Sequence, residues 1–239
     1  MKILALDSTA QVAGVALCED ERLLAEYTVN NGNTHSQTLL PMVEDVLKSL
    51  ALTPAGIDLF AVSAGPGSFT GVRIGAATVK GLAFGLDKPC IGVSTLEALA
   101  TNLAVCRGIV CPVMNARRKQ VYTAIFRSDG ETLERLLPDS AIAIAELNSI
   151  LATYRDEPIY LVGDGYGVTL ENLTVPTCPT PERLRHQSAY SVAQVAKKLY
   201  DAGVRTTDGE LVPTYLRLSQ AERERAERLE KQKNPTPQI

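Results

Sequence analysis

AVSAGPGSFTGVRIGAATVKGLAFG, residues 61–85, is the stretch that decides the fold of this chain. The apolar run Leu59–Val62 at its start predicts a short buried strand, and a glycine-rich turn then leads into a helix that ends near Phe84. In that turn Gly65 and Gly67 allow backbone angles that a side chain would forbid. Ser68 is placed to cap the helix that follows.

The glycines of this predicted helix have two interpretations. Each glycine costs up to ~1 kcal/mol of helix propensity, so something must come very close to the backbone to offset the cost. The first interpretation is tight packing of the helix against the sheet, and the second is an anion cradle at the helix start. Gly65, Gly67 and Gly71 are spaced as GxGxxxG, which fits neither the Walker loop nor the dinucleotide fingerprint. Packing is therefore the first hypothesis and phosphate binding the second.

The composition is that of an ordinary globular protein with one large or two small domains. The chain has 239 residues, 45% of them apolar and 21% charged, and a net charge of −3, so it is not expected to wrap nucleic acid by itself. Its five scattered cysteines match no zinc pattern and predict buried reduced thiols and a cytoplasmic protein. Polar residues interrupt the apolar N-terminal run and Lys80 divides the most apolar window, so neither a signal peptide nor a membrane span is predicted.

The elements are predicted to follow one order, βββαβα, twice, and two such halves would face each other across a cleft. The first half has expected strands at 2–7, 12–18, 23–29, 59–63 and 89–93, with helices at 35–50, about 69–84 and about 94–105. The second has expected strands at 109–115, 121–127, 132–137, 159–162 and 212–216, with helices at 144–154 and 188–201. The predicted domains are 1–105 and 106–217, followed by 218–239, a charged helix at 219–233 and a disordered tail.

Two helix starts carry capping boxes, Thr34 with Gln37 and Ser94 with Glu97. The helix that begins after Thr34 has an apolar stripe so broad that it suggests burial on more than one side. The helix is then either covered by its own domain alone or also in contact with another protein chain, and the sequence leaves both interpretations open.

Four segments together resemble the bacterial TsaB (YeaZ) family: ALDSTAQVAGVAL at 5–17, NTHSQTLLPMVEDVL at 33–47, the stretch 61–100, and LVPTYLR at 211–217. The resemblance runs in order through residues 1–217, and the GPGSFTGVRIG block at 65–75 is highly specific. It implies an α/β fold of the actin-like ATPase and sugar-kinase superfamily, with two ribonuclease-H-like domains. It also implies a role in making N6-threonylcarbamoyladenosine at position 37 of tRNA.

The resemblance further implies the partners of this chain. TsaB-type proteins are non-catalytic companions of the related transferase TsaD, with the ATPase TsaE as a third member, and tRNA is met only through the complex. No intrinsic cofactor is expected, with nucleotide only in the complex, and the partner-binding helices would also pair two copies when the transferase is missing. The residues expected at this interface are His35, Leu39, Leu40, Val43, Val46, Leu47, Leu50, Arg73 and Ala77.

A catalytic metal is not expected. TsaD-type relatives carry a histidine pair at i,i+4 that binds a metal, and the resemblance places those positions on Thr95 and Leu99, with Glu97 retained. Neither Thr nor Leu supplies an imidazole ligand, and the only histidines of the chain, His35 and His186, are far apart in sequence. Asn115 also stands where the family commonly has Asp. We therefore expect no catalytic residues.

A vestigial nucleotide site is the remaining candidate, formed by Asp7, Ser8, Thr9, Gly65 and Gly67. In the superfamily the carboxylate at the first of these positions would hold magnesium and the hydroxyl groups would meet phosphate. The alternative is a strand end whose Asp and Ser fix a turn by local hydrogen bonds, which we favour.

Three other groups have open roles. Arg73 would meet an anion, an acidic partner or a surface carboxylate. The run Arg117-Arg118-Lys119 would touch tRNA or be a solvated turn, and His35 fits a hydrogen-bonded helix start better than a catalyst. The competing functions are an ATP-dependent kinase or ATPase of the superfamily, a metallopeptidase-like enzyme, which the missing ligand pair disfavours, and a tRNA-binding module, which the acidic charge disfavours.

Overall fold

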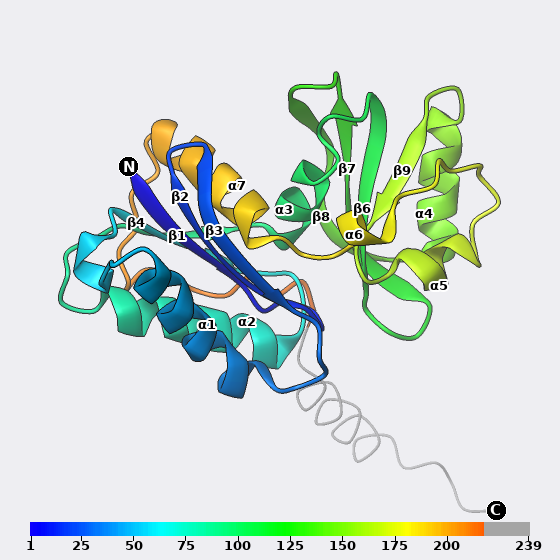
Figure 1. Cartoon of the computed structure of the whole chain (residues 1–239). Helices are drawn as coiled ribbons and strands as arrows, with labels where there is room; N and C mark the ends of the chain where they lie inside the picture. The colour runs from blue at the N-terminus through cyan, green and yellow to red at the C-terminus, as the bar shows by residue number, and fades with distance from the viewer. Residues whose placement is uncertain (218–239) are drawn as a thin grey trace, which may run out of the picture.

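The computed structural model describes residues 1–217, which form two lobes, each built on one sheet (Figure 1). The first sheet has the order β3-β2-β1-β4-β5. β1 pairs antiparallel with β2 and parallel with β4, so that Leu4 lies between Leu17 and Phe60. The strands of this sheet are β1 (Lys2–Asp7), β2 (Ala13–Glu19), β3 (Arg22–Val29), β4 (Leu59–Ser63) and β5 (Cys90–Val93).

The second sheet repeats this arrangement without a fifth strand. Its order is β8-β7-β6-β9, with β6 antiparallel to β7 and parallel to β9. The strands are β6 (Gly108–Asn115), β7 (Gln120–Ser128), β8 (Leu133–Ala143) and β9 (Ile159–Val162). Three antiparallel strands followed by a helix and a parallel strand make the ribonuclease-H-like fold, and two such lobes make the architecture of the actin-like ATPase superfamily.

Helices cover both faces of the first sheet (Figure 1). Alternate residues of β1 enter different cores, because successive side chains of a strand point to opposite faces. Leu4 and Leu6 pack with α1 (His35–Ser49) and α2 (Phe69–Ala83) on one face. Ile3 and Ala5 pack with α7 (Ala189–Asp201) on the other.

α7 packs in the first lobe, whereas the predicted domain boundary placed it in the second domain. We placed the helix at 188–201 in the domain 106–217, but its buried residues, among them Val192 and Ala196, lie in the core of the first lobe. The chain after α7 stays there: the carbonyl of Thr206 accepts from the N–H of Cys90, and the N–H of Thr214 donates to the carbonyl of Ala64. The first lobe is thus completed by the end of the described chain.

α3 (Thr95–Thr101) joins the two lobes. Leu96 and Leu99 pack in the core of the second sheet, where Phe126 is the largest fully buried side chain. Ser94 caps the helix by accepting from the N–H of Glu97, as the capping box predicts. The carboxylate of Glu97 does not reach back, because it accepts instead from Arg135 of β8 at 2.7 Å.

Other sequence-based expectations are wrong in detail. Residues 212–216 form no strand, and Thr34 makes no side-chain cap, since its carbonyl accepts from Gln37 instead. The second lobe contains α4 (Ile144–Leu151) as predicted, and also two short helices that were missed, α5 (Tyr166–Leu170) and α6 (Glu182–Arg185). Single 3₁₀ turns lie at Pro54–Gly56 and Ala152–Tyr154. The predicted helix at 219–233 lies outside the described residues, and none of the described helices is long and apolar enough to cross a membrane.

None of the five cysteines forms a disulfide, and three of them are buried as predicted, whereas Cys106 and Cys178 are half-buried. Burial raises the pKa of Cys18 and Cys111 to about 12 and that of Cys90 to about 11. Because the thiolate is the reactive form, we expect a thiol reagent to modify only the half-buried Cys106 and Cys178 in the native protein. Mass spectrometry after brief labelling, with the denatured chain as control, measures this. Equal labelling of Cys111 would contradict the structure.

Candidate functional site

The turn after β1 is closed by its own hydrogen bonds. Asp7 Oδ1 accepts from the N–H of Thr9 at 2.8 Å and from its hydroxyl at 2.7 Å, and Asp7 Oδ2 accepts from the hydroxyl of Ser63. The Asp7 side chain is only 1% exposed, and burial raises its pKa while the bonds from Ser63 and Thr9 oppose that shift. Asp7 therefore fixes the turn and joins it to β4.

The glycines of α2 pack against this same turn. A Cβ at Gly71 would lie 1.9 Å from the carbonyl oxygen of Ser8, and one at Gly67 would lie 2.5 Å from that of Thr9. The hydroxyl of Ser8 also donates to the carbonyl of Gly71 at 2.9 Å. Close packing thus explains why both positions are glycine. It also explains Gly75, where an added Cβ would lie 2.7 Å from Ser8 Oγ. Ser68 caps α2 as predicted, by accepting from the N–H of Gly71.

A magnesium–phosphate group does not fit this turn. Both oxygens of Asp7 are engaged, and Ser8 is buried with its hydroxyl donated to α2. Gly65 faces the carbonyl of Thr214, where a Cβ would lie at 2.3 Å. Of the five predicted positions only Thr9 and Gly67 line open space. No chemical step through a nucleotide is assigned here.

That open space is a cleft of about 670 Å³ between the lobes. It is lined by the turns that follow β1, β4, β6 and β9 and by the end of the described chain, so both lobes contribute strand ends to one site. The lining residues are Thr9, Ala10, Gln11, Pro66, Gly67, Ser68, Phe69, Thr70, Met114, Asn115, Ala116, Arg117, Tyr122, Asp164, Thr214, Tyr215, Leu216 and Arg217.

An aromatic cluster with one cation stands at the first-lobe side of the cleft. The rings of Phe69 and Tyr215 are 4.6 Å apart, and the guanidinium of Arg73 lies 3.9 Å from the centre of the Phe69 ring. Arg73 Nε also donates to the Tyr215 hydroxyl at 2.9 Å. Arg73 is therefore held by stacking, and not by a carboxylate within residues 1–217. The sequence identified Arg73 as a candidate, whereas Tyr215 stood only within the segment LVPTYLR, 142 residues away, with no sign that the two side chains meet.

The second-lobe side carries Asp164, an exposed residue of the cleft lining whose pKa is raised by partial desolvation there. Its Oδ1 accepts from the N–H of Asn115 at 3.3 Å, so Asn115 lies next to a carboxylate from the turn that follows β9. Arg217 Nη1 donates to the carbonyl of Ala116 at 2.8 Å, which joins the chain end to the second lobe. The sequence analysis did not identify Asp164 or Arg217 as site residues. The glycines at 163, 165 and 167 were the only signal in the sequence near Asp164.

The predicted partner-binding residues divide between the inside and the outside of the first lobe. Leu39, Val43, Val46 and Leu47 are buried in its core, with Leu50 half-buried beside them, so they form no docking surface. This corrects the expectation, because the inner half of the broad apolar stripe on α1 faces the sheet. His35 Nε2 bonds to the carbonyl of Ala10 at 2.6 Å, which is the hydrogen-bonded helix start expected for it.

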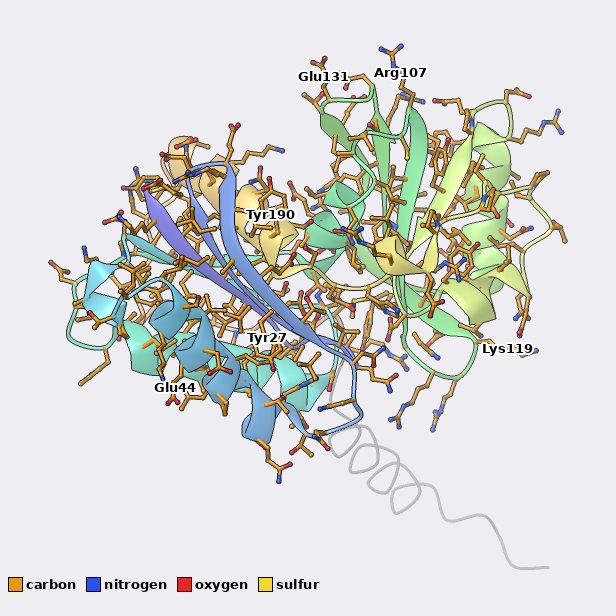
Figure 2. The ribbon with its side chains drawn as sticks, in the orientation of Figure 1. Tyr27, Glu44, Arg107, Lys119, Glu131 and Tyr190 are labelled. Carbon is orange, nitrogen blue, oxygen red and sulfur yellow. The ribbon has the colours of Figure 1, made fainter. Side chains whose placement is uncertain are left out.

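Two helices carry side chains that are exposed within residues 1–217, and we call this side of the first lobe the α1–α2 outer face. Leu40 is 47% exposed on α1, and Phe84, at the end of α2, is 80% exposed. Ala77 and Gly81 of α2 are also exposed, and because they are spaced four residues apart they lie on one side of the helix. Figure 2 shows Glu44 on α1 at this outer side of the molecule.

The two positions at which the resemblance places a histidine pair lie inside the protein. Thr95 and Leu99 are fully or almost fully buried at the α3 junction of the lobes, and Leu99 packs in the second core. Within residues 1–217, no three His, Cys, Asp or Glu side chains form a group that could hold a metal ion.

Comparisons with known proteins agree on one relationship. The family model described as "TsaD: tRNA N6-adenosine threonylcarbamoyltransferase" matches residues 23–224. The "tRNA threonylcarbamoyladenosine biosynthesis protein TsaB" of Bacillus subtilis is 33% identical over 226 residues, covering 93% of this chain and 96% of the relative.

Two solved structures from Pseudomonas aeruginosa are similar over the whole lobed architecture. One, described as YeaZ, has a TM-score of 0.76 at 28% identity and covers 90% of this chain and 99% of its own. The other, described as an uncharacterized protein with similarity to peptidase YEAZ, has a TM-score of 0.75 at 27% identity with the same coverage.

Proposed function

The chain belongs to the TsaB (YeaZ) family, and from this premise we propose that it is a non-catalytic subunit that holds a TsaD-type transferase. Family membership assigns the chain to the biosynthesis of threonylcarbamoyladenosine in tRNA. The docking surface of the proposed subunit is the α1–α2 outer face. A TsaE-type ATPase is the proposed third member, and tRNA is met through the assembled complex.

One observation carries this proposal: the two neighbouring helices α1 and α2 expose both large apolar residues and small ones. Leu40 and Phe84 are large apolar residues that stay exposed, while the small exposed residues Ala77 and Gly81 leave the α2 backbone accessible. Small residues let a second pair of helices approach closely. Exposed apolar surface of this kind marks contact sites.

The transferase is a fitting occupant because its family model matches this chain. Two related chains carry equivalent helices, which can pair across a pseudo-two-fold axis as in an isologous dimer. A stable complex of this kind buries ~800 Å² on each partner. The same logic makes pairing of two copies of this chain the competing state when the transferase is missing.

The division of labour follows from the side chains at α3. Thr95 and Leu99 cannot ligate a metal ion, and Asp7 is engaged within its own turn. In the proposed complex the transfer chemistry belongs to the partner, and the rigid first lobe of this chain supports it.

Replacing Ala77 with arginine tests the docking surface. The side chain is exposed, so the fold should be unchanged, but a long cation in the strip of small residues would keep the partner helices apart. We expect affinity for the transferase to fall by about 100-fold, which is about 2.7 kcal/mol. Co-purification and calorimetric titration of the full-length chain with the transferase of the same organism measure this.

The matched control is Ala202→Arg, the same substitution at an exposed position that follows α7 on the opposite face of the sheet. It should bind the transferase like the wild type. Wild-type affinity in Ala77→Arg would reject the α1–α2 outer face as the docking surface. Val46→Arg is not a usable probe, because Val46 is buried in the core.

A further inference from the structure

The hairpin between β6 and β7 has an unusual tip. Arg117, Arg118 and Lys119 are consecutive residues with φ of 62°, 53° and 56°. Non-glycine residues in this left-handed region are uncommon, and each costs roughly 1–2 kcal/mol. Three in a row, none of them Gly, Asn or Asp, give a costly backbone to a run of basic side chains.

The tip is fixed from its flanks. Asn115 Oδ1 accepts from the N–H of Arg117 at 2.8 Å, and the carbonyl of Lys119 accepts from the N–H of Ile144 at 3.0 Å. Arg217 adds a third support through the carbonyl of Ala116. No hydrogen bond within residues 1–217 uses the main-chain N–H of Arg118 or Lys119. The tip therefore has exposed side-chain donors and two main-chain donors without a hydrogen bond within residues 1–217.

The positive charge of the tip is not neutralised by the described part of the chain. All three side chains of the run are exposed, and Arg217 brings a fourth cation to the same place. None of the four forms an ion pair with a carboxylate among residues 1–217, whereas Arg127 and Arg135 of the same lobe do. Asp164 bonds to Asn115, a residue that flanks the tip, and does not pair with any of the four cations. This concentration of charge stands out in a chain of net charge −3.

We propose that this basic tip, residues 117–119 with Arg217, binds the phosphate backbone of the tRNA held by the complex. This inference rests on the proposed function. Successive residues of a helical turn point about 100° apart, so the side chains spread and do not converge on one small anion. Arginine, lysine and main-chain N–H groups are the donors that proteins direct to nucleic-acid phosphates.

An acidic protein surface is the less suitable partner. The core of a protein interface is apolar and depleted of lysine, but the residues beside the run are Ala116, which is buried, and Gln120, which is polar. Arg117 also lines the cleft, so the tip stands at the cleft mouth. With a net charge of −3, the isolated chain would hold RNA weakly, and the tip would add contacts to binding by the assembled complex.

The double variant Arg118→Asn/Lys119→Asn tests this inference, because asparagine tolerates the left-handed backbone. Its control is Arg107→Asn/Arg155→Asn, which removes the same charge from exposed positions. Figure 2 shows Arg107 at the end of the second lobe opposite Lys119. Arg155 lies just before β9, whose first residue pairs with the start of β6, so it too is remote from the tip.

The measurement is tRNA affinity of the complex between the full-length chain and its transferase, over about 50 to 200 mM salt. For the tip variant we expect roughly ten-fold weaker binding and a slope of log affinity against log salt that is smaller by about 2, one for each lost phosphate contact. The control should match the wild type, and co-purification with the transferase should be unchanged in both variants.

Three outcomes overturn the inference in different ways. An unchanged slope in an intact complex shows that the tip does not meet phosphate. Loss of co-purification with the tip variant shows that the tip meets an acidic protein surface. A wild-type complex that does not form, or that does not bind tRNA, rejects the proposed function itself and this inference with it.

Discussion

Replacing Gly71 with alanine is expected to destabilise the protein by about 3 kcal/mol, at the upper end of the usual cost of overpacking. The new Cβ would lie 1.9 Å from the carbonyl oxygen of Ser8, and neither partner is a flexible side-chain end that could move aside. α2 would have to shift away from the β1 turn. That shift would also break the bond from the Ser8 hydroxyl to the carbonyl of Gly71.

Gly81→Ala is the matched control in the same helix. Nothing lies within 4 Å of a Cβ at Gly81, so this variant should gain up to ~1 kcal/mol from helix propensity. Urea unfolding of both variants measures the difference. Equal effects at the two positions would show that the α2 glycines are not required for packing on the turn.

Asp7→Ala is expected to cost about 3 kcal/mol as well. The substitution leaves three buried donors without their acceptor: the N–H and hydroxyl of Thr9 and the hydroxyl of Ser63. An unsatisfied buried polar group costs ~1–3 kcal/mol, and partial relaxation keeps the total near the value for one or two such groups. Asp7→Asn should be milder, because the amide oxygen still accepts from Thr9.

The pH dependence separates the charge of Asp7 from its hydrogen bonds. Burial raises the folded-state pKa above the ordinary value of 3.8, so the native state binds this proton more tightly than the unfolded state does. The stability that this carboxyl contributes is therefore greatest below pH 3.8 and is lost as pH rises from there through the raised folded-state pKa.

The asparagine variant has no such proton. The stability of Asp7→Asn relative to the wild type should therefore improve as pH rises from 3.8 through the raised folded-state pKa of Asp7. Other carboxyls, Asp164 among them, titrate alike in both proteins and cancel in the difference. Urea unfolding at several pH values measures the difference in unfolding free energy between the variant and the wild type. A difference that is constant with pH would contradict a raised pKa at Asp7.

The regular elements of this chain could be predicted because their signals are local. β4 lies at Leu59–Ser63 as expected, and α2 ends one residue before Phe84, since apolar runs and glycine turns are short-range patterns. Ser68 and Ser94 cap their helices for the same reason. The predicted side-chain cap at Thr34 does not form, because the N–H of Gln37 donates to the backbone carbonyl of Thr34 and not to its hydroxyl.

The candidate site could be predicted only in part. Arg73 and the basic run at 117–119 are visible as unusual residues, but Tyr215, Asp164 and Arg217 join them through contacts between distant parts of the chain. The prediction of interface residues on α1 was wrong for a physical reason. A broad apolar stripe shows that a helix is buried on several sides, but not which part of the stripe its own sheet covers.

Sequence alone determined the repeated βββαβα order, the family and the absence of an imidazole pair at Thr95 and Leu99, because these depend on residue identity and on near neighbours. Tertiary structure decided the rest. It placed α7 on the first sheet, turned Val46 inward, and set Ser8 against Gly71 so that the glycines serve packing. The physical reason is that burial is settled by whichever surface is nearest in space, and the order of residues along the chain does not specify that surface.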